Sequence, residues 1–194
     1  MRAWLAAAAL ALLVASPAPA ADTNGPRTFY ADHRQYFQAF GEQPLTSLPS
    51  GTIATERLFI SHPYSGATMI RIDRRSRDAL VTVATKRYSP SYLKTAQDPV
   101  RRRTFRVPLA KVRAIDALAE DADLWRGSYP YVRGEGDEIC VDSTVPEYER
   151  LTRAGYKAVD LGNCFGAGDN LKVFSAWLRL AGLTMRNDGS YRFR

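Results

Sequence analysis

The chain has 194 residues, 45% of them hydrophobic, which is the length and composition of one folded domain with its own core. Its 27 lysines and arginines exceed its 20 aspartates and glutamates, and the formal net charge is +7 at pH 7. This charge favours anionic partners: acidic protein surfaces, membrane headgroups or polyanionic wall polymers. Beyond the first 20 residues no apolar run approaches membrane-spanning length, which argues against a membrane span.

Residues 1–20, MRAWLAAAALALLVASPAPA, have the features of a secretory signal peptide. Arg2 precedes an uncharged Ala/Leu/Val run, and small residues follow at the cleavage point. We predict cleavage between Ala20 and Ala21, which leaves 194 − 20 = 174 residues with a net charge of +6 after the loss of Arg2. The mature protein is then expected to be soluble and periplasmic or secreted, a location that argues against a nucleic-acid partner.

Residues 21–51 are interpreted as an N-terminal arm and linker. The stretch YADHRQYFQAF places Tyr36, Phe37 and Phe40 on one side of a short helix, and GEQPLTSLPSG is a linker rich in proline, glycine and serine. His33 in this arm is expected to be exposed to solvent. Residues 52–194 are interpreted as a single domain.

Strand patterns begin with TERLFISHPYSGATMIRID, in which two strands flank a bend at HPYSG. The polar turn RRSRD leads into ALVTVATKRY, which is apolar on both faces as a central strand requires. The segment RRRTFRVP predicts a further strand that Pro108 closes. Residues 145–161 predict a hairpin with Ala154 and Gly155 in its turn, and the chain ends in a short hairpin about Asp188-Gly189.

Two amphipathic helices are predicted, over about 109–125 and 170–181. The first has apolar residues at three- and four-residue steps, and Pro108 suits its first turn. Asp169 or Asn170 is the expected N-cap of the second, and Gly182 its stop. Together the elements predict an α+β fold, in which an antiparallel sheet of about five to seven strands carries both helices on one face.

The two cysteines, Cys140 and Cys164, lie in DEICVDS and GNCFGAG. Export favours a disulfide between them, worth about 3 kcal/mol in the chain-entropy model. A redox or metal pair is the alternative, but the chain has no C-x-x-C and only His33 and His62 as further zinc ligands. No metal and no cofactor are therefore predicted.

No segment carries a recognisable catalytic motif, and no catalytic residue is predicted. His62 lies near Ser61 and Ser65 in SHPYSG, but nothing like G-x-S-x-G is present. GAGDN before the second helix lacks the phosphate-binding glycine patterns and is interpreted as a turn. The loop GEGDEICVD matches no calcium or hydrolase motif and is interpreted as solvated; its acidic residues are Glu135, Asp137, Glu138 and Asp142.

Basic residues gather at two turns together with tyrosines, a mixture that is enriched in the most important contacts of protein interfaces. An arginine-rich but merely solvated surface is the alternative. The residues predicted to bind a partner are Arg71, Arg74, Arg75, Arg77, Tyr88, Tyr92, Arg101, Arg102 and Arg103.

The order of these elements resembles a group of uncharacterised exported bacterial proteins over residues 55–182. The likeness rests on a strand pair ending in a basic turn, then FRVPLAKVRAIDALAEDADLW, a hairpin ending GYKAVD, and a closing apolar helix. The resemblance implies a small periplasmic α+β domain and carries over no catalytic residue.

Three classes of function follow from the sequence. The first is a non-enzymatic module that binds another exported protein, such as an immunity protein or an inhibitor of a wall-degrading enzyme. The second is an envelope accessory protein that binds anionic lipid or polysaccharide. The third is a hydrolase whose site has no recognisable motif.

Overall fold

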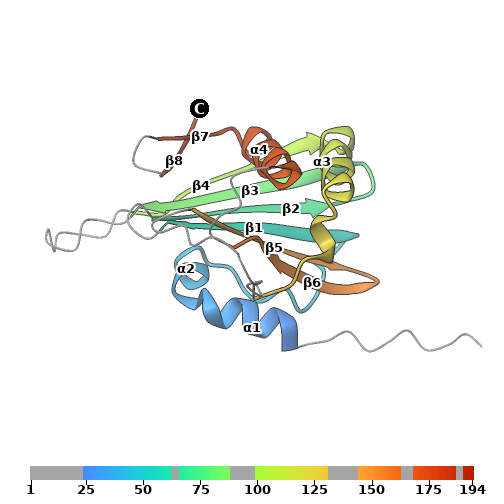
Figure 1. Ribbon diagram of the computed structural model, residues 1–194, viewed down its shortest axis with the longest axis horizontal. Coiled ribbons are helices and arrows are strands. Elements are labelled where there is room, and N and C mark those ends of the chain that lie inside the picture. Colours follow the sequence, from blue (N-terminus) through green and yellow to red (C-terminus); the bar gives the residue numbers. More distant parts are fainter. Residues whose placement is uncertain (1–23, 63–65, 88–98, 131–143, 163–167, 187–189) are drawn as a thin grey trace, which may run out of the picture.

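A six-stranded antiparallel sheet forms the centre of the computed structural model, which describes residues 24–62, 66–87, 99–130, 144–162, 168–186 and 190–194 (Figure 1). The strand order across the sheet is β4-β3-β2-β1-β5-β6. Helices lie above and below the sheet in Figure 1, so the domain has three layers. The α+β class and the strand number predicted from the sequence are confirmed.

Four strands that follow one another along the chain form the larger part of the sheet. They are β1 (Ala54–His62), β2 (Gly66–Arg74), β3 (Asp78–Arg87) and β4 (Arg101–Pro108). Each pairs antiparallel with the next, and β3 lies inside the sheet as its apolar composition predicts. Among the described strands β4 pairs only with β3, so β4 is an edge.

The predicted hairpin is present as β5 (Val145–Thr152) and β6 (Gly155–Asp160), and β5 pairs with β1. Its turn is formed by Arg153 and Ala154, one residue earlier than predicted, because Thr152 pairs with Gly155. The Thr152 hydroxyl accepts a hydrogen bond from the Ala154 amide at 3.1 Å. Gly155, at φ 136°, then leads the chain into β6.

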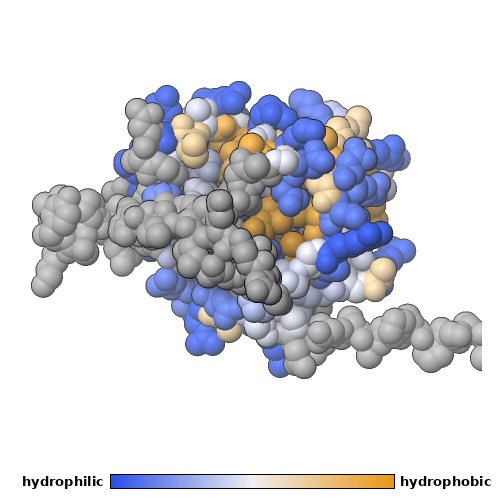
Figure 2. Space-filling view, viewed as in Figure 1, coloured by the Kyte–Doolittle hydropathy of each residue, from blue (hydrophilic) through white to orange (hydrophobic). Residues whose placement is uncertain are grey.

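Both predicted helices, α3 (Leu109–Asp121) and α4 (Asp169–Ala181), pack on one face of the sheet, as expected. Their apolar faces and the inward residues of the strands form the larger core, in which Ile70, Ile115 and Trp177 are almost fully buried. Burial of each such side chain contributes about 1.5–3 kcal/mol. Figure 2 shows apolar residues gathered in the middle of the view, with hydrophilic residues around them.

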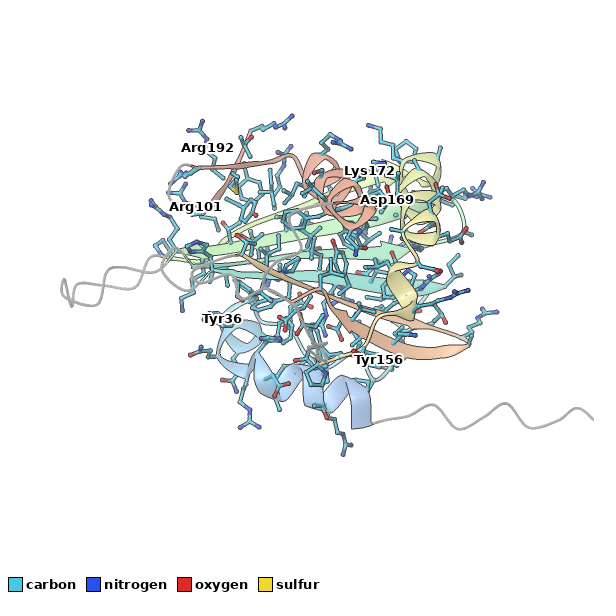
Figure 3. The ribbon with its side chains drawn as sticks, viewed as in Figure 1. Tyr36, Arg101, Tyr156, Asp169, Lys172 and Arg192 are labelled. Atoms are coloured by element: carbon cyan, nitrogen blue, oxygen red, sulfur yellow. The ribbon has the colours of Figure 1, made fainter. Side chains whose placement is uncertain are left out.

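Each helix differs from its prediction at one end. α3 stops at Asp121 because Asp123 takes a left-handed conformation, φ 52°, and a short 3-10 helix, η1 (Leu124–Arg126), follows. In α4 the N-cap position belongs to Gly168, and Asp169 lies in the first turn, 2.7 Å from Lys172 Nζ (Figure 3). Gly182, at φ 65°, ends α4 as predicted.

The predicted arm forms the third layer, on the sheet face opposite α3 and α4. It contains α1 (Asn24–Asp32) and α2 (Arg34–Ala39), which lie below the sheet in Figure 1. A second apolar cluster lies between these helices and the sheet. Its fully buried members are Phe29, Phe37, Phe40, Phe59, Met69 and Ala84.

The chain ends in a short hairpin of β7 (Leu183–Met185) and β8 (Tyr191–Phe193), as predicted. Its turn residues, 187–189, lie outside the described residues. Tyr191 belongs to the larger core and Phe193 packs against it. This packing holds the hairpin beside the sheet and fixes the positions of Arg186 and Arg192.

Candidate functional site

Two of the arginines predicted to bind a partner, Arg71 and Arg74, are engaged inside the fold. Arg71 donates to Asp73 and to Glu42, both at 2.9 Å. Arg74 donates to Glu56 at 2.7 Å and also pairs with Asp116 of α3. These contacts join β2 to the arm on one face and to α3 on the other, so the charges of both arginines are balanced within the fold.

The remaining basic residues of the prediction do not form one patch. Arg75 and Arg77 lie at the β2–β3 turn, just before Asp78. Arg101 pairs with Thr85, seven residues further along β3. At about 3.3 Å per residue, the two groups are about 23 Å apart. Arg102 and Arg103 are exposed beside Arg101, whereas Tyr88 and Tyr92 lie outside the described residues.

A cavity of about 80 Å³, here called the arginine cavity, lies where β3 and β4 meet the β7–β8 hairpin. Four of its lining residues are arginines, from β3, β4 and the β7–β8 hairpin, and none of the described residues that line it is a carboxylate. Figure 3 shows Arg101 and Arg192 at the same end of the molecule. The lining residues are Thr85, Arg87, Pro99, Arg101, Arg186, Tyr191, Arg192 and Phe193.

The hydrogen-bonding groups of the arginine cavity are donors suited to an anion. Arginine guanidinium groups stay protonated at any physiological pH. Burial raises the pKa of Tyr191 to about 12, so its hydroxyl is protonated at neutral pH. Arg186 Nε is buried and has no acceptor among the described residues. A buried donor without an acceptor costs about 1–3 kcal/mol, a cost that a bound anion would remove.

A smaller cavity of about 10 Å³ adjoins the first and shares Thr85, Arg87 and Tyr191 with it. It has room for about one water molecule, and His62 and Lys86 add two more basic groups to its lining. Gly66 also lines it, at φ 127°, where a Cβ atom would lie 2.1 Å from the Lys86 carbonyl oxygen. Only glycine fits this approach of β2 to β3.

The two described polar residues of SHPYSG, Ser61 and His62, do not form a nucleophilic pair. Ser61 and His62 are consecutive residues of β1, so their side chains point to opposite faces of the sheet. Ser65 lies outside the described residues. His62 therefore enters the site only as a basic neighbour of the arginine cavity.

A second polar cluster, which the sequence did not predict, lies between the arm and the sheet. His33 was expected to be exposed, and this was wrong: its side chain is 12% exposed, 2.9 Å from Glu147. Tyr129 donates a hydrogen bond to Asp32 at 2.7 Å, and His33 packs on Phe59 with ring centres 4.4 Å apart. Burial raises the pKa of Glu147. These contacts fasten α1 and α2 to β1 and β5.

An ion pair between Arg57 and Glu149 lies beneath the arm, and both side chains are 0% exposed. The two residues are direct neighbours across β1 and β5. Arg57 also donates to the Gln43 carbonyl at 2.9 Å, and the Tyr156 hydroxyl donates to Glu149 at 2.9 Å. The pair joins the arm, β1, β5 and β6, which is a structural role.

Several predicted features lie outside the described residues: the cleavage point Ala20–Ala21, both cysteines, and the acidic residues of 135–142. Within the described part of the chain, no group of three or more potential ligands is placed to hold a metal ion. No helix there is both long and apolar enough to cross a membrane.

Comparison with known proteins leaves the resemblance to exported bacterial proteins as a prediction. No protein-family model matches the chain, and no curated protein matches it.

Proposed function

We propose that the protein is a non-enzymatic binding module that captures an acidic, extended segment of another exported protein. The arginine cavity would receive a carboxylate of that segment, and the edge of β4 would receive its backbone. The observation that carries the proposal is the convergence of four arginines on one cavity, whose lining within the described part of the chain includes no carboxylate.

The size of the arginine cavity supports capture of a single acidic group. Sites for drug-sized ligands measure about 300–1,000 Å³, whereas this cavity measures about 80 Å³. It therefore has room for one carboxylate or another small oxyanion. Arginine binds such groups through two parallel hydrogen bonds, which add geometric specificity to the charge attraction.

The edge strand next to the cavity supports an extended partner. β4 has eight residues, and Arg101 at its first position lines the cavity. An extended peptide that adds to a sheet edge gains backbone hydrogen bonds, while pockets select its side chains. Arg102 and Arg103 would then face acidic side chains of the added segment.

Charged residues on an edge strand also have a simpler role, because they prevent aggregation between sheets. That role requires no cavity and no contribution from other segments. Arg186 and Arg192 come from a hairpin outside the sheet, and Arg186 Nε has no acceptor among the described residues. These two arginines favour a ligand over protection of the edge alone.

The direct test is calorimetric titration of the mature protein with an acetylated eight-residue peptide of alternating glutamate and valine. We expect binding that weakens with salt, since exposed charges are screened within about 10 Å at 0.1 M ionic strength. Methylation of the peptide's backbone nitrogens should weaken binding, because it removes donors to β4.

The variant Arg101→Glu with Arg192→Glu should weaken binding about 30-fold, which corresponds to about 2 kcal/mol. The matched control is Arg153→Glu with Lys157→Glu, which makes the same charge change on the exposed β5–β6 hairpin. Equal losses in both variants would reduce the effect to net charge and refute the site. Binding to phosphatidylglycerol vesicles without binding to the peptide would instead support an envelope accessory protein.

A further inference from the structure

A second concave site lies away from the arginine cavity, between α3 and α4, and we call it the α3–α4 groove. Its volume is about 540 Å³. Phe105 and Val107 of the edge strand β4 line it from the sheet. Because β4 is the last described strand on this side of the sheet, the groove lies at the sheet margin.

Helical periodicity explains why the groove is apolar and hollow. From α3 it is lined by Ala114, Ile115 and Leu118, which recur at the spacing of one helix face. Ala176 and Leu180 line it from α4 with the same spacing. The alanines contribute only a methyl group each, and the space that longer side chains would fill stays open.

Among the described residues that line the groove, the charged ones are all cations: Arg106, Lys111 and Arg179. Arg106 is 3.2 Å from Asp78, so part of its charge is balanced from outside the groove. Lys111 and Arg179 are exposed and belong to the two helices that form the walls. Within the described structure, the groove therefore combines an apolar lining with two exposed positive groups, and none of the residues that line it there is acidic.

We propose that the α3–α4 groove binds a single-chain anionic amphiphile, such as a long-chain fatty carboxylate. The acyl chain would lie along the apolar lining, and the headgroup would contact Lys111 and Arg179. The volume falls in the range of small-molecule sites. A stable protein interface takes about 20–30 residues from each side, whereas ten described residues line this groove. This site is independent of the arginine cavity and of the peptide proposed above.

Lys111 and Arg179 form the charged rim of the groove, and its preference for an anionic headgroup can be tested on the wild-type protein. Calorimetric titration of the mature protein with sodium dodecanoate and with dodecyltrimethylammonium bromide, both below micelle formation, compares two headgroups on nearly equal chains. We expect one dodecanoate per protein, with a dissociation constant on the order of 1 mM or tighter, because a myristoyl chain binds a membrane at about 100 µM and dodecanoate has about two methylenes fewer. The cationic amphiphile should bind about tenfold more weakly.

Two variants place the ligand in the groove. Ala114→Leu should weaken dodecanoate binding about tenfold, because the added side chain occupies the space of the acyl chain. Ala114 is exposed, so the substitution leaves the core intact, and thermal unfolding by circular dichroism checks this. Lys111→Glu with Arg179→Glu should weaken dodecanoate binding about fivefold and strengthen binding of the cationic amphiphile. Arg153→Glu with Lys157→Glu, on the β5–β6 hairpin, is the control and should change neither.

Three results would overturn the proposal. Equal affinity of the wild type for both amphiphiles would mean that the rim does not select an anion. Unchanged dodecanoate binding by folded Ala114→Leu would place the ligand elsewhere. A ligand-free dimer in sedimentation, lost in Ala114→Leu, would make a second copy the occupant. Should Ala114→Leu fail to fold, Ala114→Val and the two-amphiphile comparison decide the matter.

Discussion

Replacing Arg57 with methionine should destabilise the protein severely. Arg57 and Glu149 are both fully buried and paired, and Glu42 lies 3.5 Å from the same guanidinium. Methionine fills a similar volume but has no donor. It therefore leaves the Glu149 carboxylate without its cation, and among the described residues the Tyr156 hydroxyl is the donor that remains.

Breaking a buried ion pair by removal of one partner costs about 3–5 kcal/mol, because a buried charge is left uncompensated. With an m-value of about 2 kcal/mol per molar urea, the midpoint of unfolding should fall by about 1.5–2.5 M. The double variant Arg57→Met with Glu149→Leu removes both charges. Its free energy of unfolding should fall by much less than the sum of the falls in the two single variants, because apolar residues of similar volume often replace a buried ion pair at little cost.

Urea unfolding followed by circular dichroism and by tryptophan fluorescence gives the four free energies of this double-mutant cycle. Arg126→Met is the matched control, since Arg126 pairs with Asp123 on an exposed surface and should cost less than about 1 kcal/mol. If the free-energy losses of the two single variants add up to the loss of the double variant, the two groups do not interact. If Arg57→Met lowers the free energy of unfolding no more than Arg126→Met does, water reaches the Arg57–Glu149 pair.

Four further predictions follow. N-terminal sequencing of the exported protein should begin at Ala21, and an intact Met1 would contradict export with cleavage. The denatured, non-reduced protein should contain no titratable thiol if Cys140 and Cys164 are bonded. Two titratable thiols would contradict the disulfide and favour a redox or metal-binding pair. Burial raises the pKa of Glu147 above its ordinary 4.5, so the folded protein favours the protonated carboxyl group. The stability that this protonated group contributes is present at low pH and is lost as pH rises through the folded-state pKa. The free energy of unfolding, measured with urea across pH 4.5–7.5, should therefore fall less steeply with pH in Glu147→Gln than in the wild type. An unchanged slope would show that Glu147 does not cause the pH dependence. Gly66→Ala should lower thermal stability more than Gly155→Ala, because both glycines have positive φ but only Gly66 would bring a Cβ against backbone, and equal losses would exclude this steric cause.

Periodicity predicted the strands and helices of the larger core because each of those segments buries one regular face. The alternation on β1 is an example: Leu58 and Ile60 pack under α3 and α4, and Phe59 faces the arm. The helix predicted over 109–125 was too long for the same reason. The apolar spacing continues to Trp125, whereas the left-handed residue Asp123 breaks the backbone without altering that spacing.

The arm was misjudged because its apolar face is spread over two short helices. Phe29, His33 and Phe37 recur every four residues, so they lie on one side of the chain across α1 and α2. A histidine within that stripe indicates burial, and the structure places it against Phe59 and Glu147. The partner carboxylate is 114 residues away in sequence, which no local pattern reveals.

Pairing between residues far apart in sequence also limits what the net charge can predict. The charge of the chain indicated an anionic partner, but it did not indicate where on the fold that partner binds. An arginine in a strand has the same local pattern whether it pairs with a carboxylate across the sheet, as Arg57 does, or lines a cavity, as Arg101 does. Tertiary pairing neutralises Arg57, Arg71 and Arg74 within the fold. The β7–β8 hairpin brings Arg186 and Arg192 to Arg101, and the described residues that line the cavity they share include no carboxylate. Part of the excess positive charge therefore gathers where separate segments of the chain meet, and only the folded chain shows which arginines share that cavity.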